Sequence, residues 1–242
     1  MIGGQFQLRA TGMPLLSNVP ALRLALAYTI HDPPSLLPHT TAPNFTCLPV
    51  PISSGLPTLA SGRKPTIRAL VLDKDGTLCP PETSTIHPAY LAKLEKLKAS
   101  PEFAENRSSI LIVSNTAGST PRPDHEAEAV LLEKELGVPV LRQQPGRKKP
   151  LCGSDVLAFF GEHGVTENPA EIAFVGDRLA TDVLVAKELG SWSYWCSDGW
   201  RDPSAPDRDY RGIFSKIEAS FERLMRERFR KMAPLPKRLP EG

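Results

Sequence analysis

Two aspartates directly follow a short apolar run, and their position suggests metal and phosphate chemistry. Asp73 and Asp75 come immediately after Ala69–Leu72, and Gly76 and Thr77 stand behind them. Two carboxylates so close repel each other, which raises the pKa of one of them unless a cation is present. Mg²⁺ binds through one or two carboxylates together with the phosphate oxygens of a substrate. We therefore expect a cation and a phosphate here, rather than two aspartates that only cap a turn.

The same run could begin a calcium-binding EF-hand loop. Such a loop needs glycine at its sixth position and glutamate at its twelfth. Counted from Asp73, these positions hold Leu78 and Ser84. The sequence therefore excludes a calcium loop of this type.

Further polar residues stand at the ends of two other apolar runs and before one proline. They are Ser114 and Asn115 after the run 110–113, Lys149 before Pro150, and Asp177 after the run 172–176. A hydroxyl group at a strand end can donate to a phosphate oxygen, and a lysine at a helix N-terminus adds its charge to a dipole that favours anions. Asp177 could join Asp73 around one metal ion. Asp182, five residues further on, could orient Lys149 or a metal-bound water.

Each of these residues also has an ordinary structural explanation. Ser-Asn is a common turn, a lysine-rich loop is usually solvated, and Asp177 could simply cap a helix. The residues point to function only as a set. Phosphoryl transfer needs a nucleophile, a proton donor, a metal and positive groups around the phosphate, and the set supplies each of them.

The order of the predicted elements places the whole set at one edge of a sheet. Patterns typical of strands cover 68–72, 109–114, 139–142, 172–176 and 192–196, and helical patterns cover 88–99, 124–136, 151–163 and 178–189. This alternation predicts an α/β fold with a Rossmann-like parallel sheet flanked by helices. Gly137 and Gly190 stand where two of the helices should end. Since ligands bind beyond the carboxyl ends of such strands, the candidate residues should converge on one site.

Composition divides the chain into an N-terminal membrane-associating extension (1–66), a central domain (67–212) and a C-terminal basic helix with a tail (213–242). The net charge of the 242 residues is +2, yet residues 1–68 carry +4, residues 69–212 carry −6 and residues 213–242 carry +4. Basic ends around an acidic centre suggest that the ends meet an anionic surface. The sequence holds no apolar run long enough to span a membrane.

Each terminal segment contains one predicted helix. Residues 17–31 are apolar nearly all round, so this helix must be buried against protein or membrane, and the lack of acidic residues before Asp32 also fits an import signal. Residues 213–232 form an amphipathic helix that could pack on the sheet or lie on an anionic membrane. Its apolar stripe consists of Phe214, Ile217, Phe221, Leu224, Met225, Phe229 and Met232. Its basic residues include Arg223, Arg226, Arg230 and Lys231.

The four cysteines are widely separated, at Cys47, Cys79, Cys152 and Cys196. Their spacing is unlike that of a zinc site or a disulfide framework, and it fits a reducing compartment.

Taken in order, the motifs resemble the four-motif pattern of the haloacid dehalogenase (HAD) superfamily of phosphatases, over about residues 67–196. The resemblance implies that Asp73 attacks phosphorus and that Asp75 acts first as an acid and then as a base. The phosphate would be held by Ser114, Asn115 and Lys149, the last chosen over Lys148 because it adjoins Pro150. Mg²⁺ would be bound by Asp73, the carbonyl oxygen of Asp75 and Asp177. Supporting roles would fall to Asp182, Lys74 and Arg178.

A narrower resemblance concerns the phosphatidylglycerophosphate phosphatases of fungal and plant mitochondria and their bacterial relatives. It is carried by "VLDKDGTL", "IVSNTAGS", "GVPVLRQQPGRKKP" and "VGDRLATDVLVAKELGS", and by the upstream "SLLPHTTAPNFTCLPVPI". It implies Mg²⁺-dependent hydrolysis of phosphatidylglycerophosphate to phosphatidylglycerol, a step toward cardiolipin. The protein would act as a peripheral enzyme on the matrix side of the mitochondrial inner membrane, without a nucleic-acid partner.

The spacing between the motifs favours a large or lipid substrate. Between Asp75 and Ser114 lie 38 residues and between Ser114 and Lys149 lie 34, enough for one helix each but not for a cap domain over the site. Two alternatives stay open. One is a capless HAD phosphatase that acts on a phosphoprotein or a nucleic acid end, and the other is a non-catalytic peripheral membrane protein. Self-association is also an option, because several weak membrane contacts on one particle add avidity.

Overall fold

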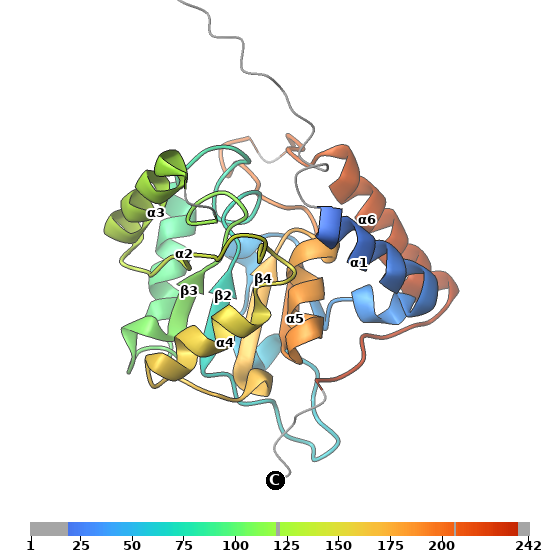
Figure 1. Cartoon of the computed structure of the whole chain (residues 1–242). Coiled ribbons are helices and arrows are strands. Elements are labelled where there is room, and N and C mark those ends of the chain that lie inside the picture. The colour runs from blue at the N-terminus through green and yellow to red at the C-terminus, as the bar shows by residue number, and fades with distance from the viewer. Residues whose placement is uncertain (1–18, 120–121, 206, 237–242) are drawn as a thin grey trace, which may run out of the picture.

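The computed structural model describes residues 19–119, 122–205 and 207–236, which fold around one parallel sheet (Figure 1). The strands follow the order β1-β5-β4-β2-β3 across a five-stranded sheet. They are β1 (Thr40–Ala42), β2 (Ala69–Leu72), β3 (Ile110–Ile112), β4 (Ile172–Gly176) and β5 (Trp192–Cys196). All neighbouring strands pair in parallel, so the predicted α/β class is confirmed.

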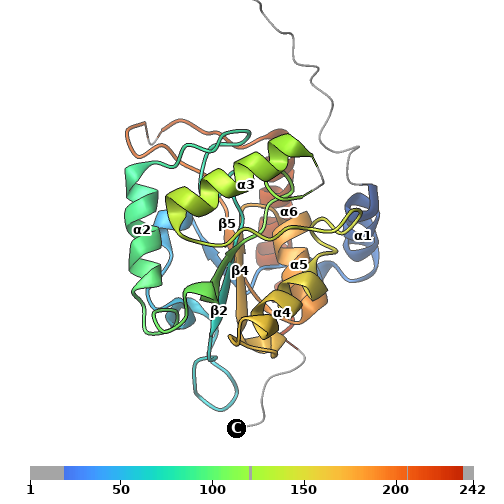
Figure 2. The same cartoon turned by 60° about the vertical axis from the view of Figure 1, so that its left-hand side comes forward.

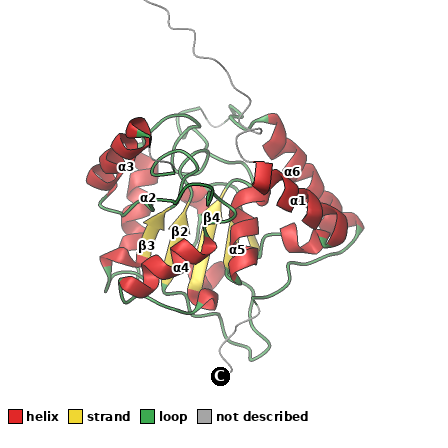
Figure 3. Ribbon diagram, viewed as in Figure 1, coloured by secondary structure: helices red, strands yellow, loops and turns green. Residues whose placement is uncertain are grey.

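Helices cover both faces of this sheet (Figures 2 and 3). They are α1 (Val19–His31), α2 (Pro88–Lys98), α3 (Pro123–Leu136), α4 (Gly153–Glu162), α5 (Leu184–Leu189) and α6 (Ile213–Arg223). Two π-helical turns, η7 (Leu179–Val183) and η8 (Leu224–Arg228), lead into α5 and extend α6. Helices α2 and α3 share one hydrophobic cluster with the sheet, and α4 and α5 share another on the opposite face.

The strands show why the apolar runs do not alternate with polar residues. Leu70 and Leu72 of β2 point into the cluster under α2 and α3, whereas Ala69 and Val71 point into the cluster under α4 and α5. Because both faces are covered by helices, both sets must be apolar. The polar residues are thereby confined to the strand ends, where the sequence analysis placed the site.

The prediction of a strand at 139–142 is wrong. Val140 makes only an isolated bridge to Ile112 at the β3 edge of the sheet. The bridge consists of two hydrogen bonds, from the Ile112 N–H to the carbonyl oxygen of Pro139 and from the Leu141 N–H to that of Ile112, and Pro139 has no N–H with which to extend the ladder. The opposite edge of the sheet is formed by β1, which the sequence analysis did not predict.

Strand β1 shows that part of the predicted N-terminal extension is folded into the sheet. Thr40–Ala42 pair with Tyr194–Cys196 of β5, and the residues that follow them enter the main core. Those core residues are Phe45, Leu48, Ile52 and Leu56, each 2% exposed or less. The part of 1–66 that spans 40–56 therefore belongs to the same folded body as the predicted central domain.

The predicted helix ends are close to the observed ones. Gly137 and Gly190 both cap helices with a left-handed conformation, at φ of 61° and 82°. The helix predicted at 213–232 ends at Arg228, and residues 17 and 18 of the other terminal helix lie outside the described residues.

The described residues between the motifs leave the site without an inserted cap domain. One α-helix, α2, lies between β2 and β3, and α3 is the α-helix that follows β3. In the described part of the chain, no helix is both long and apolar enough to cross a membrane. All four cysteines are free thiols, as their spacing indicated.

Candidate active site

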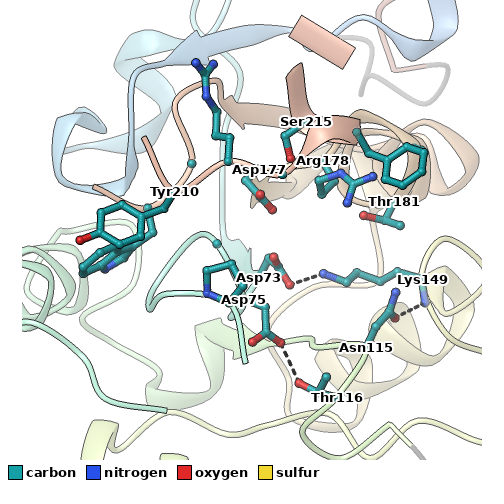
Figure 4. A pocket seen from close by; sticks show the side chains of 18 of the residues that line it. Asp73, Asp75, Asn115, Thr116, Lys149, Asp177, Arg178, Thr181, Tyr210 and Ser215 are labelled. Carbon is teal, nitrogen blue, oxygen red and sulfur yellow. Dashed lines mark hydrogen bonds and ion pairs between the residues drawn. The ribbon is translucent and has the colours of Figure 1, made fainter. Parts of the chain in front are cut away.

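The candidate residues meet where the central strands end. Asp73 follows β2, Asp177 follows β4, and Lys149 reaches them from the loop before α4 (Figure 4). The Lys149 ammonium group contacts the Asp73 carboxylate and lies 2.6 Å from Oδ1 of Asp182. Each of these three side chains is at least nine-tenths buried. The sequence analysis left two options for Asp182, and the observed contact is the one that orients Lys149.

The charges of this cluster do not cancel within the protein. Burial alone would lower the pKa of Lys149, but Asp182 and Asp73 raise it well above its usual range, so the lysine is charged. The pKa of Asp73 is raised to about 7, mainly by burial and also by Asp182 and Asp75, against the opposing effect of Lys149. Burial also raises the pKa of Asp177, with added repulsion from Asp73 and Asp182. One lysine therefore faces more negative charge than it can neutralise.

This excess of negative charge fits a hard divalent cation. Carboxylate oxygens of Asp73, Asp177 and Asp182 lie within 4.8 Å of one another. The Oδ1 atom of Asp177 is buried and has no hydrogen-bond partner among the described residues. Lys149 contacts both Asp73 and Asp182, but the other carboxylate oxygen of Asp182 also accepts from the backbone N–H of Arg178 at 3.1 Å, so Asp177 and then Asp73 are the better ligands. Oxygen donors of this kind are those that Mg²⁺ prefers.

Two glycines allow the carboxylates to approach the backbone this closely. Gly76 has φ +79°, and a Cβ atom there would lie 2.6 Å from Oδ2 of Asp177. A Cβ atom on Gly176 would lie 2.2 Å from the carboxylate carbon of Asp182. Both distances are below van der Waals contact, so any side chain at these positions would displace the acidic cluster.

Asp75 is held separately from the cluster, by neighbours on both carboxylate oxygens. Its Oδ1 lies 2.8 Å from Nζ of Lys74 and accepts from the backbone N–H of Glu82 at 3.1 Å. Its Oδ2 accepts from the hydroxyl group of Thr116 at 2.7 Å and more weakly from that of Ser114 at 3.3 Å. These contacts fix the orientation of the Asp75 carboxylate.

Lys74 is buried beneath Asp75 and is 1% exposed. Burial would lower its pKa, but Asp75 and Glu128 outweigh that effect and raise it. Glu128 of α3 lies 2.6 Å from Nζ of Lys74 and also accepts from Ser84. A chain of charges thus connects α3 to Asp75 through Lys74.

The motif Ser114-Asn115-Thr116 divides its side chains between the protein interior and the pocket. The Ser114 side chain is fully buried, and its hydroxyl contacts Thr116 and Asp75. Among the described residues, Asn115 and Thr116 line the pocket. The Asn115 side chain accepts from the backbone N–H of Lys149 at 3.0 Å, so it positions the lysine loop, whereas Lys148 turns to the Asn115 carbonyl oxygen. The structure thus brings Lys149 rather than Lys148 to Asp73.

The pocket above these residues has a volume of about 490 Å³. Asp73, Asp75, Lys149 and Asp177 lie on its wall, and Arg178, Leu22 of α1 and Phe214 of α6 also line it. Arg178 pairs through Nε with Glu218 of α6 at 2.9 Å. The chain of contacts from Asp177 to α6 therefore forms one side of the pocket.

Sequence reasoning missed Thr116, Glu128 and Glu218. Thr116 lies two residues after Ser114 and could have been weighed as a second hydroxyl group. The two glutamates lie on surface-type helical stretches, and their contacts with Lys74 and Arg178 depend on how the helices pack. The sequence carries no local signal for such pairs.

Comparison with known proteins identifies the relatives of this chain. The family described as mitochondrial PGP phosphatase, in which PGP stands for phosphatidylglycerophosphate, matches residues 20–201. The mitochondrial phosphatidylglycerophosphatase GEP4 of Saccharomyces cerevisiae is 37% identical over 177 residues, which cover 73% of this chain and 86% of that protein. A probable mitochondrial phosphatidylglycerophosphatase of Schizosaccharomyces pombe is 30% identical over 76% of this chain and 85% of its own length. A crystal structure of a putative HAD-like phosphatase from Mesorhizobium loti aligns with a TM-score of 0.35 and 22% identity, over 66% of this chain and 88% of that one.

Proposed function

Because the chain belongs to the mitochondrial phosphatidylglycerophosphate phosphatase family, we propose that it hydrolyses phosphatidylglycerophosphate to phosphatidylglycerol and inorganic phosphate. The observation that carries this proposal is the meeting of Asp73, Lys149 and Asp177 in one buried pocket that the described residues leave without a cap. The two relatives named as phosphatidylglycerophosphatases match this chain over most of their length. The reaction belongs to the synthesis of cardiolipin.

Asp73 is the proposed nucleophile. One of its carboxylate oxygens forms a bond to phosphorus while the bond from phosphorus to the glycerol oxygen breaks, which leaves an aspartyl-phosphate. Asp75 gives its proton to the departing glycerol oxygen. In the second half, water attacks phosphorus, Asp75 takes a proton from that water, and the bond between Asp73 and phosphorus breaks. Both aspartates return to their starting state.

The positive groups have separate proposed roles around the phosphate. Lys149 donates to the phosphate oxygens and is oriented by Asp182, and Asn115 holds the backbone of Lys149 in place. Thr116 and Ser114 donate their hydroxyl protons to Asp75 and orient its carboxylate, and of the two Thr116 also lines the pocket that would hold the phosphate. Lys74 keeps Asp75 in position, and Arg178 lines the pocket beyond Asp177.

Asp73, Asp177 and the carbonyl oxygen of Asp75 would hold a Mg²⁺ ion. The raised pKa values of both carboxyl groups and the unpaired Oδ1 atom of Asp177 support this assignment. When bound, the ion supplies positive charge that offsets the repulsion between the carboxylates and the incoming phosphate.

The proposed location follows from the mitochondrial relatives and from the lipid substrate. We place the enzyme at the matrix side of the mitochondrial inner membrane, as a peripheral protein on an anionic surface. Self-association on that surface is compatible with this placement. A nucleic-acid partner is not part of the proposal.

The test is phosphate release from phosphatidylglycerophosphate, with phosphoserine peptide and 5′-phosphorylated DNA as competing substrates. We expect the lipid to be hydrolysed with a kcat/KM at least about a hundredfold above either competitor, a ratio within the range that binding differences produce. Preference for the peptide or the DNA would reject the lipid assignment while keeping the phosphatase chemistry.

A further inference from the structure

The two terminal helices present an apolar surface that the described residues leave uncovered. On α1 the exposed apolar residues are Val19, Leu22, Leu26 and Ile30, with exposures of 40%, 44%, 56% and 63%. On α6 and η8 they are Ile213, Phe214, Ile217 and Leu224, with exposures of 71%, 38%, 57% and 49%. We refer to these eight residues as the α1–α6 face. Exposed apolar patches of this kind mark a membrane or protein contact.

The rest of each helix is packed on the protein, so the orientation of this face is fixed. Ala25 of α1 is buried, Tyr28 donates to Glu188 of α5, and Phe221 of α6 packs against the cluster that contains Ala25. Glu218 of α6 accepts from Arg178 and from the backbone N–H of Ala180 at 3.0 Å. The predicted apolar stripe of 213–232 is therefore divided, because Phe221 and Met225 turn inward while Ile217 and Leu224 stay exposed.

The α1–α6 face adjoins the catalytic pocket. Leu22 of α1 and Phe214 of α6 belong to the face and also line the pocket that contains Asp73 and Lys149. Figure 4 places Ser215, at the start of α6, on the same side of the pocket as Arg178 and Thr181. Figures 1 and 2 show α1 and α6 on the same side of the molecule. A molecule that leaves the catalytic pocket along this wall passes directly onto the exposed apolar surface.

The charged residues on these helices indicate what kind of surface the α1–α6 face binds. Arg23, Arg223 and Arg228 are exposed, and Lys216 is exposed and pairs with Asp209 at 3.5 Å. Glu227 is the one exposed acidic residue among the described residues of α1, α6 and η8. The other two acidic residues, Glu218 and Glu222, are paired with Arg178 and Arg226. Apolar residues bordered by basic ones match an anionic lipid surface. A symmetric dimer through this face would bring the same basic residues of both copies together and would cover the pocket, so a second copy fits less well.

We propose that the α1–α6 face inserts into an anionic bilayer and that the lipid substrate reaches Asp73 along Leu22 and Phe214 without leaving the membrane. This inference rests on the proposed lipid phosphatase function and specifies how that substrate is taken up. The acyl chains remain among the bilayer lipids next to the face. The head group alone enters the pocket.

The experiment compares a face variant with a matched control. The face variant is Leu26→Ser, Ile30→Ser, Ile217→Ser and Leu224→Ser, all at exposed positions that do not line the pocket. The control is Val130→Ser with Leu131→Ser on α3, which are 50% and 61% exposed and lie away from the α1–α6 face. Binding is measured by co-sedimentation with phosphatidylcholine vesicles with and without phosphatidylglycerol. Activity is measured on long-chain phosphatidylglycerophosphate in those vesicles and on a short-chain, monomeric form.

We expect the face variant to lose at least about tenfold in vesicle affinity, since four apolar side chains no longer insert, and to lose vesicle activity in parallel. Its kcat/KM on the short-chain lipid should stay within about twofold of wild type, because the site is untouched. The control should behave as wild type, and added salt should weaken binding of wild type to anionic vesicles.

Three results would overturn the inference. The first is that the face variant binds vesicles as well as wild type does. The second is that it loses activity equally on both substrates. The third is that wild type is a dimer by light scattering and that the face variant dissociates while its vesicle binding is unchanged. Failure of the proposed function would give a different result. In that case wild type would hydrolyse neither lipid, while the vesicle-binding comparison would still test whether the α1–α6 face inserts into the bilayer.

Discussion

At the scale of single residues, the site is an acidic cluster with one internal cation. Lys149 contacts Asp73 and Asp182, while a carboxylate oxygen of Asp177 has no hydrogen-bond partner in the described structure. In the proposed reaction, Lys149 must therefore exchange a contact with Asp73 for contacts with phosphate. Asp182 keeps the ammonium group in place during that exchange.

Replacing the proposed nucleophile should remove turnover. The amide of Asp73→Asn cannot attack phosphorus, and we expect kcat to fall by several orders of magnitude, the scale seen when a covalent nucleophile is lost. The measurement is phosphate release from the short-chain lipid under saturating substrate. Asp207→Asn, at an exposed position, serves as the control and should retain wild-type activity. If Asp73→Asn keeps a tenth of wild-type activity, another group is the nucleophile.

Removing the proposed metal should silence the enzyme, and removing a ligand should weaken its binding. EDTA should abolish activity, and added Mg²⁺ should restore it. Asp177→Asn should raise the Mg²⁺ concentration for half-maximal activity by about tenfold or more, because one charged ligand is lost. The readout is a Mg²⁺ titration of both proteins. Full activity in EDTA would contradict the metal assignment.

The contact between Glu128 and Lys74 should affect the first half-reaction according to whether the leaving group needs a proton from Asp75. Glu128→Gln leaves Lys74 with Asp75 as its remaining acidic partner, which should displace the Asp75 carboxylate. In single-turnover measurements, we expect formation of the aspartyl-phosphate to slow about tenfold with the lipid, whose alkoxide leaving group needs a proton, and to change little with p-nitrophenyl phosphate. Glu135→Gln, at an exposed position on the same helix, is the control. Equal losses on both substrates would indicate a general structural defect.

Much of the site was predictable because two of its acidic residues, Asp73 and Asp177, directly follow strands. A parallel sheet brings Asp73 and Asp177 together whenever β2 and β4 are neighbours, as they are here. What could not be predicted depends on side-chain rotation and helix packing. Ser114 turns into the protein, and Glu128 meets Lys74 across 54 positions of sequence.

At the scale of elements, the length of a strand determined whether the sequence predicted it. Runs such as Ile172–Gly176 and Trp192–Cys196 were predicted with their observed bounds, since both are long and buried on both faces. Strand β1 has three residues, two of them threonines, and its pairing with β5 is set by the distant partner strand. The run 139–142 had the right composition but contains a proline that cannot complete a ladder.

His39 connects β5 to the C-terminal segment and should make the free energy of unfolding depend on pH. Its Nδ1 atom accepts from the N–H of Ser193 in β5, and its Nε2 atom lies 3.1 Å from the carbonyl oxygen of Pro234. Burial lowers its pKa from 6.5 to about 4. The folded state therefore keeps His39 neutral where the unfolded chain takes up a proton, so this contribution is present above pH 6.5 and is lost as the pH falls toward 4.

The size of this effect should be about 2–3 kcal/mol in the free energy of unfolding. It can be measured by urea unfolding of wild type and His39→Gln across that pH range. The difference between the two proteins should shrink as the pH falls. A constant difference would show that His39 does not titrate between its folded and unfolded states.

At the scale of the whole molecule, the segment before the motifs is part of the core. Phe45 is fully buried, stacks on Tyr90 of α2 with ring centroids 6.0 Å apart, and lies outside the region predicted as the domain. Phe45→Ala should lower the free energy of unfolding by about 3–5 kcal/mol, the usual cost of emptying such a site. Phe229→Ala, 55% exposed at the other end of the chain, should cost little. Equal effects in urea unfolding would contradict this view of the core.

The pairing of β1 with β5 has a consequence for the order in which the protein can fold. Thr40 pairs with Tyr194, and in the sheet β5 lies between β1 and β4. In a chain made from its N-terminus, β1 appears well before its partner strand β5. Contacts between such distant positions form slowly, because a long loop must close first. Until β5 has been made, β1 lacks its partner strand, and an unpaired strand of this kind is a site at which other chains can pair.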